Sequence, residues 1–283
     1  MFCRTTLNYV AASGGHPMAP APVEVDVFDA RAASTSLPGW RACGFERVAH
    51  ASSVRDWTDD DEIASVHYAE IEALARSLTG CDFALVSDHV KRTAENVKRT
   101  REQSPVRLVH SDFAADYEDV ARGAYVDVRG RGAATLARSG RSAEDVSAAA
   151  RIVMMQFWRN LGAPKMDLPV AFCDARTVTP AEGRPFHYTG YVAGGRSFDA
   201  LAIVATPEGT ARHRWYVYPS LAADEVVAFR TYDTSLVAAG STWFTPHSAF
   251  PDPDVPAGQP PRFSIELRVM CVFSSPSSFT APA

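Results

Sequence analysis

The sequence predicts a mainly β protein, built as an antiparallel sandwich or barrel with a few flanking helices. Its second half carries short runs rich in Val, Phe, Tyr and Trp, which Pro, Gly and Asp separate. Few helical patterns interrupt these runs, whereas a doubly wound sheet would alternate strands with helices. The pair Gly194-Gly195 is isolated and belongs to no GxGxxG or Walker pattern, so nucleotide-dependent chemistry has no support.

The composition is that of an ordinary globular protein. Of the 283 residues, 46% are hydrophobic and 22% are charged, which argues against a disordered chain. The net charge of −5 argues against nucleic acid as a partner, because such binders usually present a basic face. No apolar run reaches the roughly 20 residues that span a bilayer, and no secretory signal pattern is present. Five scattered cysteines without a CxxC pair predict reduced thiols and a cytoplasmic location.

The chain is expected to divide into three segments. Residues 1–40 predict an irregular lead-in, because 11–38 are rich in Ala, Gly, Ser and Pro. Residues 41–273 predict one domain, and the small, polar residues 274–283 predict a loose tail.

Two helices can be predicted from their ends. The acidic run 59–62 favours a helix start, apolar residues then recur at helical spacing, and Gly80 suits the helix end. Ser142 and Asp145 resemble a capping box before an Ala-rich stretch. The basic run 91–101 is balanced by acids and predicts a solvated loop or helix.

Nine segments are predicted as strands from their β-branched and aromatic content. They are 83–86, 106–113, 152–158, 168–173, 198–205, 215–218, 226–232, 242–250 and 263–273.

The first chemical signal is the pair His110 and Asp112. On a strand, residues i and i+2 point to the same side, so an imidazole and a carboxylate would meet at one point. Together they supply two ligands of the 2-His-1-carboxylate triad that holds non-haem Fe(II). Taken alone, the pair is more often a strand-end histidine beside a solvated acid.

A second histidine and a strand further on complete the pattern. His247 lies 137 residues after His110, and Arg262 and Ser264 then share one side of a strand. A guanidinium and a hydroxyl suit the distal carboxylate of 2-oxoglutarate, whose 2-oxo acid end would chelate the iron. His213 is the alternative third ligand, and otherwise it lines the substrate pocket or is structural.

The order of these motifs resembles the CmcJ/AsaB-like hydroxylase/desaturase family. That family includes a cephem-methoxylation component and fungal secondary-metabolite tailoring proteins, and it is similar to Fe(II)/2-oxoglutarate dioxygenases. Asn160 and Phe263 stand where the family usually has proline and glutamate. The resemblance rests on Asn8-Tyr9-Val10, Gly44-Phe45, His50, Val54-Arg55-Asp56-Trp57, Asp88-His89, Arg107, Val109-His110-Ser111-Asp112, Phe157-Trp158-Arg159, Leu168-Pro169, Cys173-Asp174, His213-Arg214-Trp215-Tyr216, 225–233, Pro246-His247-Ser248-Ala249-Phe250 and 262–268.

The resemblance implies a double-stranded β-helix, the jelly-roll or cupin-like barrel. It implies an Fe(II)- and 2-oxoglutarate-dependent oxygenase that uses O2 to hydroxylate or desaturate a small-molecule secondary metabolite. Arg159 and Arg268 are, with His213, expected near the substrate, although a surface role for Arg159 and a backup carboxylate contact for Arg268 stay open.

Two other hypotheses come from different classes. The barrel could be a non-catalytic accessory protein for a partner biosynthetic enzyme such as a methyltransferase. It could also be a non-redox metal barrel, for example an isomerase, which would keep the triad and ignore 2-oxoglutarate.

Overall fold

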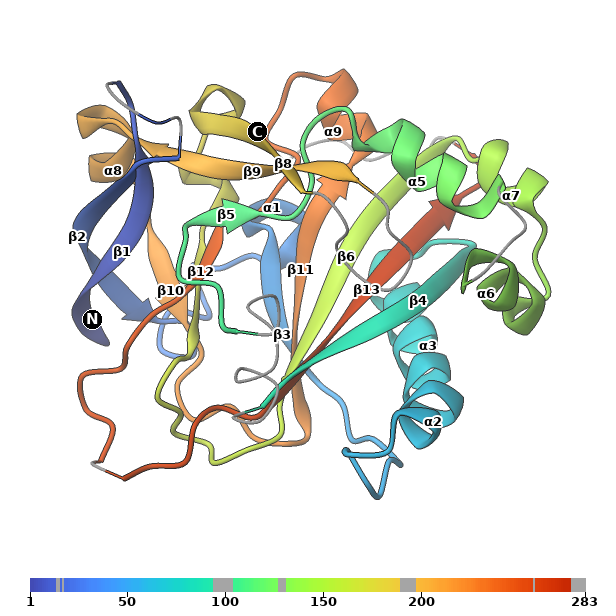
Figure 1. The fold of residues 1–283 in the computed structure, drawn as a ribbon, viewed down its shortest axis with the longest axis horizontal. Helices are drawn as coiled ribbons and strands as arrows, with labels where there is room; N and C mark the ends of the chain where they lie inside the picture. Colours follow the sequence, from blue (N-terminus) through green and yellow to red (C-terminus); the bar gives the residue numbers. More distant parts are fainter. Residues whose placement is uncertain are drawn as a thin grey trace.

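Two β-sheets face each other and form the body of the molecule (Figure 1). The computed structural model describes residues 1–13, 16, 18–93, 104–126, 131–188, 197–256 and 258–275. In the larger sheet the strand order is β1-β2-β10-β7-β12-β5-β9-β8, and pairing of β1 with β9 closes seven of the eight strands into a ring. Its strands are β1 Cys3–Ala11, β2 Pro20–Asp29, β5 His110–Ser111, β7 Val170–Cys173, β8 Gly183–Tyr188, β9 Phe198–Ala205, β10 Trp215–Val217 and β12 His247–Ala249.

The second sheet has five strands in the order β3-β11-β6-β13-β4, all antiparallel. Its strands are β3 Phe45–Ala49, β4 Phe83–Arg92, β6 Arg151–Asn160, β11 Glu225–Asp233 and β13 Ser264–Phe273. Every residue of β6 is buried. Met154 packs in the core between the sheets, while Val153 and Met155 pack in a second core under the helices. Both faces of this strand are therefore covered, as its nearly continuous apolar sequence requires.

Helices cover the outer face of the five-stranded sheet, and Figure 1 shows α2, α3 and α6 on the β4 side of this sheet. The predicted helix at 59–79 is confirmed: the Asp59 carboxylate accepts from two backbone N–H groups, and Gly80 ends the helix at φ 76°. The predicted capping box of Ser142 and Asp145 is also present. The helical segments are α1 Trp40–Cys43, α2 Asp60–Glu62, η1 Ile63–His67, α3 Tyr68–Thr79, α5 Tyr117–Val126, α6 Arg131–Ser139, α7 Ala143–Ser147, η3 Ala175–Thr177, η4 Pro180–Glu182, α8 Pro207–Arg212 and α9 Thr234–Ala238.

The N-terminal segment differs from its prediction. Residues 1–40 contain β1 and β2, which belong to the closed ring, so the irregular lead-in is wrong for these stretches. In β2 every second residue from Val23 to Val27 is valine, and this alternation outweighs the flanking Ala and Pro. Assignment of 41–273 as one domain stays a prediction. Of the predicted tail, 276–283 lie outside the described residues.

Other differences concern strand lengths. Each of the nine segments predicted as strands contains a strand of the structure. Within 106–113 and 242–250, however, the strands are only β5 and β12, which have two and three residues. The prediction of a solvated loop or helix for the basic run 91–101 is wrong at its start, because Lys91 and Arg92 end β4. Residues 94–101 lie outside the described residues. Among the described residues, no helix has the length and apolarity needed to cross a membrane.

Candidate metal centre

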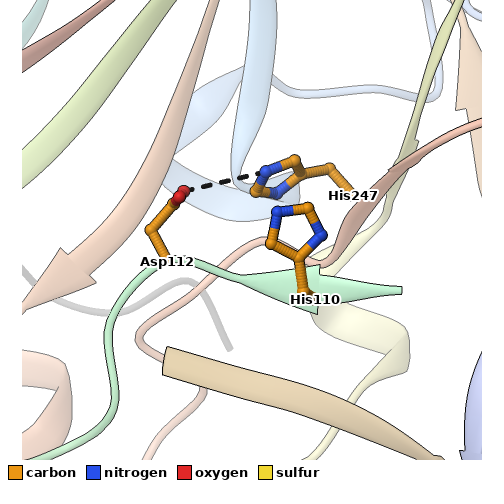
Figure 2. A group of neighbouring side chains, drawn as sticks. All are labelled: His110, Asp112 and His247. Carbon is orange, nitrogen blue, oxygen red and sulfur yellow. Dashed lines mark ion pairs between the residues drawn. The ribbon is translucent and has the colours of Figure 1, made fainter. Parts of the chain in front are cut away.

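Two histidines from distant parts of the chain meet on neighbouring strands of the larger sheet. His110 on β5 and His247 on β12 are register partners in an antiparallel pair, so their side chains leave the same face of the sheet. Their ring centroids lie 4.3 Å apart, and both residues are buried. Figure 2 shows the two imidazoles side by side, with Asp112 facing them.

Backbone carbonyls hold both rings in one tautomer. The Nδ1–H of His110 donates to the Leu108 carbonyl at 2.8 Å, and that of His247 donates to the Thr245 carbonyl at 3.1 Å. Each Nε2 therefore keeps its lone pair for a metal, the arrangement that metal-binding histidines usually show. Burial, together with the neighbouring His247, lowers the pKa of His110 to about 4, so this ring is neutral at pH 7.

Asp112 supplies the acid of the group. It follows the end of β5 and still reaches the point expected from the His-x-Asp spacing, with its Oδ2 3.7 Å from His247 Nε2. One ligand atom from each of the three residues lies within 4.8 Å of the others. Two imidazole nitrogens and one carboxylate oxygen form the donor set of a 2-His-1-carboxylate site, so these residues fit Fe(II).

The three side chains open into a cavity of about 630 Å³ between the two sheets. This volume is ample for a small co-substrate together with a second organic molecule. Its apolar walls come mostly from the segment before β5 and from β8 and β9, whereas most of its charged lining comes from the end of β4, from β13 and from the residues just before β13. The apolar lining includes Val106, Leu108, Phe186, Tyr188 and Phe198, and the charged lining includes Arg92, Arg107, Arg262, Glu266 and Arg268.

Arg262, which the sequence predicts as a ligand of the co-substrate, lines this cavity and is held in place from two sides. Its Nη1 donates to the Leu168 carbonyl at 2.7 Å, and its guanidinium lies 5.6 Å from the Trp158 ring centroid. Within the described part of the chain, its buried Nε has no hydrogen-bond partner. Burial and the nearby Arg92 lower its pKa to about 9, which leaves the guanidinium charged at neutral pH.

Ser264 begins β13 two residues further on. It is buried, and its Oγ also lacks a partner among the described residues, although it is not among the residues that line the cavity. Buried donors without partners are unfavourable. Arg262, which does line the cavity, therefore suits an anionic guest such as a carboxylate.

The sequence argument missed an ion pair in the same lining. Arg92 donates to both carboxylate oxygens of Glu266, at 2.6 and 3.2 Å, and both side chains are largely buried. Burial alone would raise the pKa of Glu266, but the surrounding guanidiniums, Arg92 foremost, lower it to about 2. Glu266 has the same strand parity as Arg262 and Ser264, and that parity could have revealed it.

Two residues expected near the substrate lie elsewhere. His213 is absent from the cavity lining, and its ring nitrogens bond the Tyr9 hydroxyl at 3.0 Å and the Glu182 carboxylate at 3.2 Å. Arg159 lies outside the lining too, and it donates to the His50 carbonyl at 3.0 Å. In β6 only alternate residues face the cavity side, and Arg159 has the wrong parity. Arg268 does line the cavity.

The family of the chain follows from a match over nearly its whole length. The model of the family described as "Oxidoreductase/YMDC permease-like domain" matches residues 6–272. The chain belongs to this family. Within the family's range lie both histidines, Asp112, Arg262 and Ser264.

Similar proteins carry the names that the sequence resemblance predicts. The Fe(II)/2-oxoglutarate-dependent dioxygenase nvfI of Aspergillus novofumigatus (strain IBT 16806) is 28% identical over 215 residues, which cover 74% of this chain and 68% of the relative. The hydroxylase/desaturase efuI of Hormonema carpetanum is 28% identical over 221 residues, which cover 73% and 70%. The predicted kinship with hydroxylase/desaturases of the Fe(II)/2-oxoglutarate type is confirmed.

A solved structure confirms the fold class. The iron and alpha-ketoglutarate-dependent endoperoxidase NvfI, in a structure described as a different conformation, superposes with a TM-score of 0.75 at 22% identity, covering 97% of this chain and 98% of that one. The mainly β fold with a jelly-roll, cupin-like core is therefore as predicted.

Proposed function

We propose that this chain is a non-haem Fe(II)/2-oxoglutarate-dependent oxygenase that hydroxylates or desaturates a small molecule. The observation that carries this proposal is the convergence of His110, Asp112 and His247 on one point of the cavity between the sheets. The similar proteins described above are named as dioxygenases, hydroxylase/desaturases or an endoperoxidase, which favours an enzyme over an accessory protein.

In this proposal His110, Asp112 and His247 hold Fe(II). Once bound, the iron with 2-oxoglutarate and O2 would supply the oxidising power that breaks a C–H bond of the substrate. The Leu108 and Thr245 carbonyls keep the two imidazoles aimed at the metal position.

Arg262 and Ser264 bind the distal carboxylate of 2-oxoglutarate in this proposal. The support is the pair of buried donors that have no partner among the described residues, one of which belongs to a positively charged guanidinium in an interior of low dielectric. A carboxylate between them would satisfy both groups, and its binding would exclude water from the inner part of the cavity.

The aromatic and aliphatic walls suggest a substrate that is a small, largely apolar molecule. A secondary metabolite fits this description, and a partner biosynthetic enzyme would supply or consume it. All five cysteines are buried free thiols, and this supports the cytoplasmic location that we propose for the protein.

The test is release of succinate from 2-oxoglutarate under air, with Fe(II) and ascorbate. The parent protein should release succinate, and anaerobic addition of Fe(II) and 2-oxoglutarate should give a weak visible charge-transfer band. His110→Ala should abolish both signals, because two ligands cannot hold the metal as three do. His16→Ala is the matched control, because His16 is exposed and away from the cavity lining. Full succinate release by His110→Ala would refute the proposal.

A further inference from the structure

Gln156 and Arg268 approach Asp112 together from the opposite sheet. They are register partners on β6 and β13, so their side chains leave the same face of the five-stranded sheet. Asp112, in contrast, follows β5 of the larger sheet. The cavity lies between, and all three residues line it.

The two side chains contact different oxygens of the carboxylate. Gln156 donates a short hydrogen bond from Nε2 to Asp112 Oδ2, the same oxygen that faces His247. Arg268 places Nη2 3.5 Å from Asp112 Oδ1. The carboxylate is thus held at both ends by groups from a rigid pair of central strands.

Burial makes these contacts strong. Gln156 is 2% exposed, and the side chains of Asp112 and Arg268 are 11% and 12% exposed. A buried amide between the apolar neighbours Met154 and Trp158 on the inner face of β6 is unfavourable unless it is hydrogen-bonded. The bond to Asp112 meets that requirement, which ties the position of the carboxylate to the framework of the second sheet.

We propose that Gln156 and Arg268 are positioning residues that hold Asp112 as a one-oxygen metal ligand; this inference rests on the function proposed above. A carboxylate that turned to bind through both oxygens would take a fourth position on a six-coordinate metal. Only two positions would then remain for the two ligand atoms of 2-oxoglutarate and for O2. By engaging Oδ1 and Oδ2 separately, the pair keeps three positions open.

The charge of Arg268 has a second effect. Asp112 and the metal carry opposite charges, and a guanidinium on the outer oxygen reduces the electron donation of the carboxylate to the metal. Removing the charge while keeping the stem, as in Arg268→Met, should therefore alter the metal's electronic spectrum as well as its affinity. Arg268→Lys keeps the charge and should restore part of the parent behaviour.

The experiment measures metal binding directly, with Co(II) under anaerobic conditions as the probe. Dissociation constants and visible spectra are recorded for the parent, Gln156→Met, Arg268→Met and Arg268→Lys. Removal of either partner should raise the Co(II) dissociation constant about 10-fold to 100-fold, the usual effect of losing such an outer contact. It should also change the intensity of the visible bands, which depends on coordination number.

A matched control shares the strand face. Met154→Leu alters the inner face of β6 two residues from Gln156, and Met154 is not among the residues that line the cavity, so this variant should bind Co(II) like the parent. 2-Oxoglutarate should then bind to the cobalt form of this control as it binds to the parent, and it should bind more weakly to the cobalt form of Gln156→Met. If one variant does not fold, the others carry the same comparison.

The outcomes separate the two proposals. A parent protein that binds neither Co(II) nor Fe(II) overturns the proposed function and this inference with it. A parent that binds metal and 2-oxoglutarate, with Gln156→Met and Arg268→Met unchanged in affinity and spectrum, overturns only the positioning role. Weaker Co(II) binding in both Gln156→Met and Arg268→Met, with partial recovery in Arg268→Lys, supports the positioning role.

Discussion

Removing the carboxylate of Glu266 should destabilise the protein strongly, since it leaves the buried Arg92 guanidinium without the opposite charge of Glu266. The pKa of Glu266 falls from the ordinary 4.5 to about 2 in the folded protein. At 1.36 kcal/mol per pKa unit, this corresponds to about 3 kcal/mol of stability at pH 7. Breaking a buried ion pair by removing one partner has a similar effect, about 3–5 kcal/mol.

The sign of the pH dependence follows from the lowered pKa. The stabilisation is complete well above pH 4.5, the unfolded value, and it is lost as the pH falls toward 2. By pH 3.5 about 1 kcal/mol of it should be gone. Glu266→Gln lacks the titrating group, so the difference between the parent and this variant should shrink on acidification.

Urea unfolding followed by tryptophan fluorescence measures this difference at pH 7 and pH 3.5. Glu24→Gln is the matched control, because the Arg4–Glu24 pair is exposed, with side chains 64% and 71% accessible. Such surface pairs contribute at most about 1 kcal/mol. Equal unfolding free energies for Glu266→Gln and the parent at pH 7, or a difference that does not shrink at pH 3.5, would refute the reasoning.

Two further predictions concern the site and its support. Arg262→Lys loses the unpartnered Nε donor, so the KM for 2-oxoglutarate in the succinate assay should rise about 10-fold to 100-fold, with Fe(II) affinity unchanged; an unchanged KM would contradict the assigned role. At Gly44, where φ is +90°, an added Cβ would lie 2.3 Å from Thr245 Oγ1, and the Thr245 carbonyl holds His247. Gly44→Ala should lower both the unfolding free energy, by about 1–3 kcal/mol, and the Fe(II) affinity. Gly80→Ala is its control, because φ is +76° there but no atom lies within 4 Å, so loss of Fe(II) affinity in both variants would count against the coupling.

Much of the fold was visible in the sequence where the local pattern was strong. The helix at 59–79 was predictable because its acidic start, apolar spacing and terminal glycine agree. The strands β1 and β2 were missed because Ala, Pro and Gly around them suggested irregular chain, although Val23, Val25 and Val27 alternate as in a strand. The ring that these strands complete is a long-range pairing, which no local pattern encodes.

The candidate site divides in the same way. His110 with Asp112, and Arg262 with Ser264, could be proposed from the sequence because each pair is two residues apart, and a strand turns that spacing into a shared face. Glu266 was missed although its parity matched, and Arg92 was missed because the basic run around it suggested solvated chain. Its burial becomes evident only from the pairing of β4 with β13.

By itself the sequence determined the chemical types present: two imidazoles, a carboxylate and a guanidinium in an order that resembles one family, on a β-rich chain. Only the tertiary structure decided which histidine joins His110, because the register of β5 against β12 brings His247 to it, while hydrogen bonds to Tyr9 and Glu182 occupy His213. The structure alone also placed Gln156 and Arg268 on the two oxygens of Asp112. The physical reason is that spacing along the chain sets which side chains share a face, whereas strand pairing and sheet packing set which faces meet.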